Sequence, residues 1–313
     1  MLQFVLRRIL QVIPILLGVT LVTFALVQMM PGSIADMLVP PSAPQSLKDE
    51  INRIYGFDRS LFEQYFLWLG QLLAGNLGLS LVSSRPVAGE IFAAMLNTLQ
   101  ITLISAVIGF SLGTLFGALA ALNAGKWPDR LFTLVSIAGV SVPHYWLAIL
   151  MVTIFSVQFN LLPAQGIGPP GFPLTWEQWR PMIMPIFTLS LIPMGVVGRL
   201  VRASVLEVLS QEFVQALGAK GLRNREVRRH IAKNAAPAVL AVMGLQFGYL
   251  LGGSILVETV FNWPGTGKLL NQAIFTNDMP IIQATVLVLS IMFVLVNLLV
   301  DVAQAAIDPR MRR

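Results

Sequence analysis

The 313-residue chain is 56% hydrophobic and only 12% charged, about half the charged fraction of an average soluble domain, which argues against a soluble enzyme. It contains no cysteine, which excludes disulfides, thiolate metal sites and cysteine nucleophiles, and its two histidines argue against a histidine metal cluster. The 21 Lys and Arg residues outnumber the 15 Asp and Glu residues, giving a net charge of +6.

Six stretches carry almost no charged residue and are long enough to cross hydrocarbon about 30 Å thick. The sequence therefore predicts six transmembrane helices. The first stretch is too long for a secretory signal and is expected to remain as an anchor. The tail of the third stretch is rich in Pro and Gly and predicts an external loop. The six stretches are 9–35, 91–125, 131–176, 181–198, 234–257 and 279–300.

Most Lys and Arg residues fall on one side of this topology, at the two chain ends and in the segments 126–130 and 199–233. Cytoplasmic loops of membrane proteins carry such an excess. Both termini and the 199–233 segment are therefore predicted to be cytoplasmic. The basic charge is explained by membrane orientation, and no nucleic-acid partner is expected.

Residues 31–90 are predicted to form a small external subdomain with two helices. Ser46 with Asp49, and Ser60 with Glu63, have the spacing of capping boxes. Both helices are expected to lie on the membrane or on neighbouring spans. A platform for an external partner and a lid over the helix ends are equally compatible with this pattern.

Small residues recur at four-residue intervals in the second and fifth stretches. Lipid supplies no hydrophobic drive between helices, so such stripes favour close backbone packing. Static packing is favoured over a sliding surface. The glycines expected to pack are Gly109, Gly113, Gly117, Gly244, Gly248 and Gly252.

A few polar residues fall inside the predicted spans. His144 lies about 13 residues into the third stretch, near the midplane at 1.5 Å per residue. An ionisable group at this depth suggests a functional role, although a hydrogen-bonded packing residue is the alternative. The candidate residues of a translocation pathway are His144, Gln246, Gln283 and Asn297.

The stretch 264–268 partly matches a phosphate-binding loop, but Asn262 stands where the motif requires Gly. No other catalytic constellation is visible, so no enzymatic site is predicted. Energy for uphill transport would come from an ion gradient or from a separate subunit. Near this stretch, Glu258, Trp263 and Lys268 are candidates for an outer gate, and Glu258 is expected to be accessible from outside.

The longest cytoplasmic segment favours a separate subunit. Ser210 is placed to cap a short amphipathic helix that has Glu212 in its first turn, and Gly221 is placed to stop it. A basic helix follows Asn224, and Pro237 is expected to open the fifth span. An amphipathic helix turned sharply into a basic one fits a groove on a partner. Lipid phosphates would explain the basic helix but not the first one.

This loop resembles that of permease subunits of ATP-binding-cassette (ABC) importers, whose signature reads E-A-A, three residues, Gly, nine residues, Ile. Gly221 and Ile231 have that spacing and Ala216 matches, whereas Gln215 and Leu217 depart. The peptide-importer branch has the version E-[YF]-V-x-x-A-x-A-K-G-L. The residues that match it are Glu212, Phe213, Val214, Ala216, Ala219, Lys220, Gly221 and Leu222.

The likeness covers essentially the whole chain and is closest to permeases for dipeptides, oligopeptides, glutathione and nickel. The further matching residues are Arg7, Arg8, Pro31, Gly32, Tyr55 to Asp58, Gln64, Tyr65, Gly78, Ser80, Leu81, Arg85 to Val87, Asn234, Ala235, Pro237, Glu258 to Phe261, Trp263 to Gly265, and Asp308 to Arg310.

The resemblance implies an all-α membrane protein with the type I ABC importer permease fold and six transmembrane helices. Residues 1–93 would hold the first helix and a helical extracytoplasmic segment. Residues 94–303 would form the transmembrane core, with a cytoplasmic coupling loop at 203–236, and 304–313 a cytoplasmic tail. The coupling helix would comprise Glu212, Phe213, Ala216, Leu217, Ala219, Lys220, Gly221 and Leu222.

The resemblance also implies partners in the cytoplasmic (inner) membrane: a second homologous permease subunit, two cytoplasmic ATPases and an extracytoplasmic substrate-binding protein. This chain would bind no cofactor, because ATP and Mg²⁺ would be held by the partner ATPases. The expected cargo is di- or oligopeptides or peptide-like solutes of the glutathione type, with nickel or a metal chelate as the alternative. An ion-coupled transporter, the alternative outside this class, would need paired ionisable groups inside its spans, and only His144 is found there.

Overall fold

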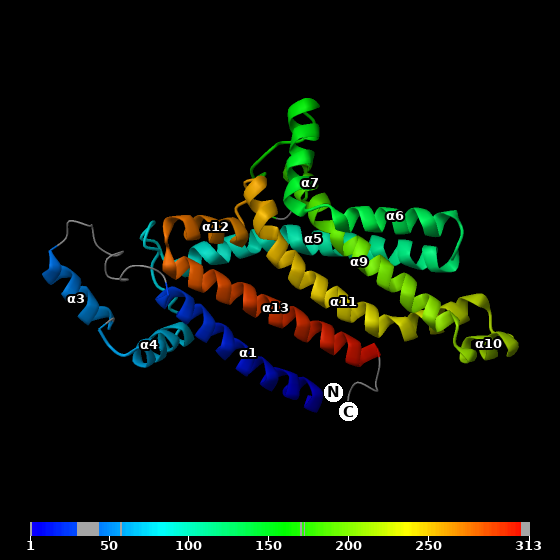
Figure 1. Ribbon diagram of the computed structural model, residues 1–313, viewed down its shortest axis with the longest axis horizontal. Helices are drawn as coiled ribbons and strands as arrows, with labels where there is room; N and C mark the ends of the chain where they lie inside the picture. The colour runs from blue at the N-terminus through cyan, green and yellow to red at the C-terminus, as the bar shows by residue number, and fades with distance from the viewer. Residues whose placement is uncertain (1, 30–43, 57, 170, 172, 308–313) are drawn as a thin grey trace. The chain divides into compact units, whose positions relative to one another are not determined.

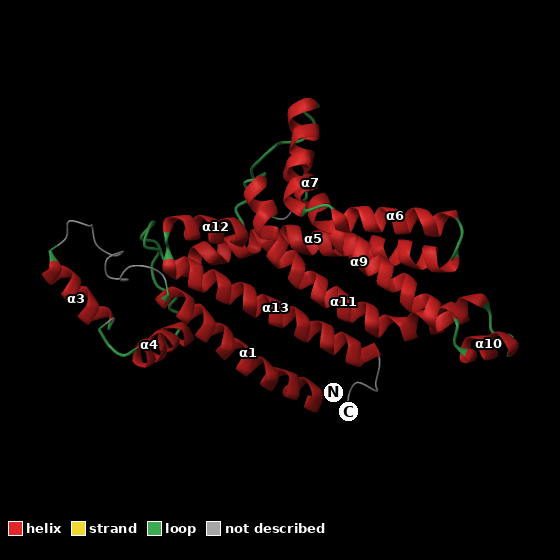
Figure 2. Cartoon of the chain, in the orientation of Figure 1, coloured by secondary structure: helices red, strands yellow, loops and turns green. Residues whose placement is uncertain are grey.

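The computed structural model describes residues 2–29, 44–56, 58–169, 171 and 173–307 (Figure 1). Helices dominate these residues, and no β-strand occurs among them (Figure 2). An all-helical membrane protein, as predicted, is confirmed. Some residues that support the family resemblance lie outside the described ones, namely Pro31, Gly32, Phe57, Asp308, Pro309 and Arg310.

Among the described residues, five continuous helical segments are long and apolar enough to cross a membrane, and a bent pair of helices makes six if the pair is one span. The bent pair comprises α6 (Trp127–Ser141) and α7 (His144–Met151), the latter continued by the π-helical η1 (Val152–Gln158). The five continuous segments contain α1 (Leu2–Gln28), α5 (Val87–Leu122), α9 (Ile183–Leu209) with the short α8 (Trp176–Trp179) and η2 (Arg180–Met182) before it, α11 (Asn224–Val260) and α13 (Met279–Ile307).

The third predicted span is broken where the sequence suggested an uninterrupted crossing. The two halves meet at 97°, and Val142 and Pro143 between them are extended. Proline removes a backbone donor and disfavours helical geometry in the residue before it. His144 is therefore the first residue of α7 and does not lie in the middle of a continuous helix.

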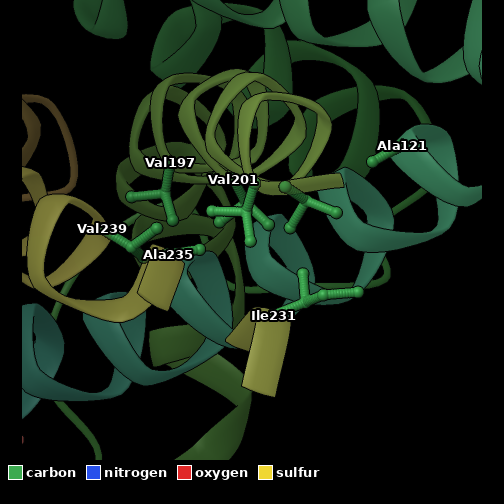
Figure 3. Packing of buried hydrophobic residues seen from close by; sticks show 8 residues of the cluster. Ala121, Val197, Val201, Ile231, Ala235 and Val239 are labelled. Carbon is green, nitrogen blue, oxygen red and sulfur yellow. The ribbon is translucent and has the colours of Figure 1, made fainter. Parts of the chain in front are cut away.

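The chain divides into two compact units, and the first contains Met1–Ile9, Leu96–Lys268 and Phe293–Arg313. Helix α9 is its most enclosed span and packs against α6 and α11. Small and β-branched side chains from α5, α9 and α11 interlock in one apolar cluster (Figure 3). Its members are Ala121, Val197, Val201, Val205, Val208, Ile231, Ala235 and Val239.

Glycines of α5 lie directly against α9. A Cβ added to Gly109 would come within 2.8 Å of the Ser190 carbonyl oxygen, and one added to Gly113 within 2.7 Å of the Met194 carbonyl oxygen. One added to Gly117 would overlap the backbone of α9. Only glycine permits helix backbones to approach this closely.

The glycines of α11 are less uniform. Gly244 faces Val300 of α13, and a Cβ on Gly248 would meet the ring of Phe293. Gly252 is exposed, and no described atom outside its own helix turn lies within 4 Å of a Cβ placed there. The neighbouring Gly253 makes the close contact instead, against the ring of His144.

The second unit contains Leu10–Met95 and Leu269–Met292, and includes α3 (Gln45–Tyr55), α4 (Leu61–Leu73) and most of α12 (Thr266–Thr276). The buried Asp278 carboxylate accepts hydrogen bonds from the Ser80 hydroxyl and the Leu81 N–H, which fixes the loop before α5. The unit's apolar core consists of Val87, Ile91, Ala273, Ile281 and Ala284.

The two predicted capping boxes have different outcomes. Ser60 caps α4 and Glu63 bonds back to the Ser60 N–H, as predicted. Ser46 is not a cap, because α3 already begins at Gln45, where the Pro44 carbonyl accepts the first helical bonds. Asp49 accepts a hydrogen bond from the Gln45 side chain.

Candidate functional site

Helix α10 (Glu212–Ala219) connects α9 to α11 and carries most of the predicted coupling residues. None of its residues is buried. Phe213 and Val214 pack against the apolar cluster of α9 and α11. Glu212, Ala216, Ala219 and Lys220 are exposed, whereas Leu217 is half-buried. One face of the helix is thus anchored to the bundle and the other is open.

The turn after α10 is a Schellman motif. Gly221 has φ +77°, its N–H donates to the Gly218 carbonyl at 2.9 Å, and the Leu222 N–H donates to the Leu217 carbonyl at 3.3 Å. This left-handed conformation favours glycine because it has no Cβ. The chain therefore turns sharply between α10 and α11 at the position that the sequence indicated.

Two details of this loop differ from expectation. Ser210 does not cap α10; it ends α9, with its hydroxyl bonded to the Glu207 carbonyl, and Gln211 occupies the N-cap. Pro237 does not separate a basic helix from the fifth span, because it lies inside α11 (Asn224–Val260), which is one helix of 37 residues. Proline is tolerated within membrane helices where neighbours compensate the lost bond. The basic segment and the fifth span are consequently one continuous helix.

A second link joins α6 to α9 close to this loop. The Arg202 guanidinium binds the Asp129 carboxylate through Nε and through Nη2, the latter at 2.8 Å, and Asp129 also accepts from the Gly125 N–H at 2.9 Å. Asp129 is 4% exposed. Fork-like pairing of this kind is among the strongest polar contacts in proteins. Local sequence patterns do not indicate this pair, because Asp129 and Arg202 lie far apart in the chain.

At its other end, α11 finishes in a buried polar corner. Glu258 is 0% exposed and accepts hydrogen bonds from the Thr98 hydroxyl at 2.7 Å and from the N–H groups of Gly267 at 2.7 Å and Lys268 at 3.1 Å. A carboxylate at this position satisfies donors in the first turn of α12 and interacts favourably with its dipole. Glu258 therefore holds the first turn of α12, up to Lys268, against α11 and Thr98 of α5.

Trp263 belongs to the same corner. It is 1% exposed, its indole N–H donates to the Asn97 carbonyl at 3.0 Å, and the Asn97 amide donates to the Pro264 carbonyl at 2.9 Å. A Cβ on Gly265 would lie 2.5 Å from the Glu258 carboxyl carbon. The glycines that suggested a phosphate loop thus make room for a carboxylate of the same chain.

This corner corrects two expectations. Glu258 is buried and not accessible, although Lys268 is partly exposed. It also lies within α11, so His144 is not the only ionisable group in the candidate spans. The partner of the buried Glu258 carboxylate, Thr98, lies far away in the sequence, so no local pattern indicates this contact. An outer-gate role for these residues stays a prediction.

Two candidate pathway residues lie at the same face of α11: Gln246 belongs to this helix, and His144 of α7 packs against it. His144 lies against Gly253, which is two helical turns from Gln246. His144 Nε2 and Gln246 Oε1 are both buried, and neither has a hydrogen-bond partner among the described residues. Asn297 is satisfied by the Phe293 carbonyl at 2.8 Å, and Gln283 belongs to the other unit. Buried polar atoms without a hydrogen-bond partner are uncommon inside proteins. This property distinguishes His144 and Gln246 from the other two candidate pathway residues.

Comparison with known proteins covers the entire chain. Residues 113–313 match the family model described as "Binding-protein-dependent transport system inner membrane component", and residues 1–112 match the model of its N-terminal part. The chain is 39% identical over 313 residues to the glutathione transport system permease protein GsiC of Escherichia coli O6:H1, covering 100% of this chain and 99% of the relative. Identity to GsiC of Shigella dysenteriae serotype 1 is also 39% with the same coverage.

A solved structure shares the fold. The inward-facing MetNI methionine ABC transporter has a chain that matches with a TM-score of 0.56 and 18% identity, covering 70% of this chain and 96% of that one. The combination of this fold with matches from end to end establishes the family. The chain belongs to the inner membrane components of binding-protein-dependent ABC transport systems.

Proposed function

We propose that the chain is one of two permease subunits of an ATP-driven importer for peptides or peptide-like solutes of the glutathione type. The observation that carries this proposal is the end-to-end similarity to a glutathione transport permease. A second homologous permease, two cytoplasmic ATPases and an extracytoplasmic binding protein complete the importer. ATP and Mg²⁺ bind to the ATPases, and this chain holds no cofactor.

In this importer both termini and α10 face the cytoplasm, and the Glu258 corner faces outwards. The distribution of Lys and Arg supports this orientation. So does the geometry of α11, since α10 and the Glu258 corner lie at opposite ends of one helix that is long enough to cross the membrane (Figure 1).

Helix α10 is the coupling element. Its open face, with Glu212, Ala216, Ala219 and Lys220, enters a groove on an ATPase, while Phe213 and Val214 hold it to α9 and α11. The Schellman turn at Gly221 makes the joint with α11 short, so displacement of α10 moves the span as one body. The solute pathway runs past His144 and Gln246, whose open polar atoms supply hydrogen bonds to a polar solute.

The test begins with purification from the native host in mild detergent through a tag at the C-terminus, followed by mass spectrometry. Two ATPases and a second permease are expected to co-purify. Reconstituted vesicles with the binding protein should then take up labelled glutathione or dipeptides only when ATP is supplied. A chain that purifies alone and transports without ATP would instead identify an ion-coupled transporter. ATP-driven uptake of a nickel chelate but not of peptides would contradict the solute class alone.

A further inference from the structure

Helix α4 is held against α1 by a row of contacts at the end of α1. The Gln28 amide donates to Gln64 Oε1 at 2.9 Å, and the Tyr65 hydroxyl lies 2.9 Å from the Thr20 hydroxyl. The Tyr65 ring also meets Phe24 edge-on, with ring centroids 5.5 Å apart. These contacts join helices of the same unit, so they fix the position of α4 along α1.

The contacts also fix the depth of α4. The candidate span in α1 ends at Gln28. A helix rises 1.5 Å per residue, so Phe24 lies about 6 Å and Thr20 about 12 Å inside that end. The uncharged part of α1, residues 9–28, is about 30 Å long and fills the hydrocarbon, so α1 has little room to shift outwards. Because its Tyr65 reaches Thr20, α4 lies at the membrane boundary and not in the water above it.

A second apolar stripe on α4 is uncovered. Phe62, Phe66, Leu69 and Leu73 recur at helical spacing beside the stripe that meets α1. Phe62 is 72% exposed, Phe66 52% and Leu73 81%. The two phenylalanine rings contact each other edge-on, with centroids 4.7 Å apart. Phe and Leu are typical of the apolar face of a helix that lies in the membrane interface.

The rest of the exposed surface of α4 is mostly polar or small. Glu63 and Gly70 flank the apolar stripe and Gln71 lies opposite it, all exposed, with Leu67, 44% exposed, between them; Glu63 is the only charged residue of the helix. A helix with one apolar face and one polar face, placed at the boundary, has the character of an interfacial helix, which buries its apolar side about 5–10 Å into the headgroup and acyl region.

We propose that α4 is a membrane-embedded interfacial helix whose Phe62, Phe66 and Leu73 lie among lipid acyl chains, with Gln71 in water. The partner of this surface is lipid, because the depth set by α1 places the stripe at hydrocarbon level. Lipid thereby anchors the segment that joins the first two spans. The inference rests on the proposed topology only in assigning α4 to the outer leaflet.

The absence of native cysteine makes a direct test available. Single variants Phe66→Cys and Leu73→Cys, with Gln71→Cys as the matched control, are made in the complete importer. Intact cells are treated with a membrane-impermeant thiol reagent. In a second experiment, a fluorophore is attached to the same thiol of each purified complex, and the complexes are reconstituted in vesicles. The vesicles contain lipids with nitroxide labels at one of two acyl depths, and quenching of the fluorophore by each label is measured.

Gln71→Cys should react at least about ten times faster than the other two, since a thiol in hydrocarbon does not ionise. Fluorophores at 66 and 73 should be quenched by the shallow nitroxide, and the one at 71 should not. Equal reactivity of all three, without quenching, would place α4 in water and overturn the proposal. Protection at 66 and 73 without lipid quenching would also overturn it, because protein would then cover the stripe. Failure of Gln71→Cys to react from outside would contradict the topology instead.

Discussion

The two ends of α11 are corners built in opposite ways. At the α10 end, the turn at Gly221 uses backbone hydrogen bonds alone, and Lys220 and Gly221 are exposed. At the other end, Glu258 is fully enclosed and satisfies three donors of its own chain. An exposed corner leaves its surface available to another protein, whereas an enclosed corner keeps its polar groups inside and joins helices of the same chain. Substitutions at the two should therefore fail in different ways.

The largest expected effect is that of Gly221→Pro. Proline fixes φ near −65° and has no N–H, so it cannot adopt the φ of +77° or donate to Gly218. Membrane insertion should be normal, and ATPase assembly or solute-stimulated ATP hydrolysis should be abolished. Co-purification of the ATPases and their activity in vesicles measure this. Normal stimulated hydrolysis would refute the coupling role of the corner.

Glu258→Ala should have the opposite character. It leaves the buried Gly267 N–H and the partly buried Lys268 N–H without an acceptor, and it reduces the Thr98 hydroxyl to its contact with the Thr266 hydroxyl at 2.9 Å. Each buried donor left unsatisfied costs about 1–3 kcal/mol. The purified importer should unfold at a markedly lower temperature, whereas the exposed Glu212→Ala should change unfolding little. Equal unfolding temperatures for Glu258→Ala and the native importer would show that the corner contributes nothing to the fold.

The contrast between the corners reflects what sequence alone reveals. The glycine that ends α10 follows from chemistry within one turn, so it was predictable, whereas the N-cap predicted at Ser210 was wrong because that residue ends α9. The apolar runs likewise indicated the spans. The enclosure of Glu258 depends on Thr98 and Gly267, which the fold brings together, and the Asp129–Arg202 pair depends on two helices packing. Local periodicity contains no information about such contacts.

A corner of intermediate burial should give an intermediate effect. Asp129 ties the turn between α5 and α6 to α9, but the Arg202 side chain remains 33% exposed. Asp129→Asn keeps an acceptor for the Gly125 N–H while removing the ion pair, so a loss of about 1 kcal/mol is expected after screening by solvent. Thermal unfolding should fall between those of Glu212→Ala and Glu258→Ala. A loss as large as that of Glu258→Ala would mean that exposure does not rank these corners.

The smallest effect separates backbone conformation from side-chain volume at Gly221. The left-handed conformation costs an L-residue such as Ala roughly 1–2 kcal/mol, and Asn adopts it more readily than Ala. No described atom lies within 4 Å of a Cβ at this position, so the chain itself accommodates either side chain. Gly221→Asn should therefore keep more coupled ATP hydrolysis than Gly221→Ala. If both are as inactive as Gly221→Pro, the requirement for glycine comes from an ATPase surface packed against the corner, and the exposed turn is itself part of the interface.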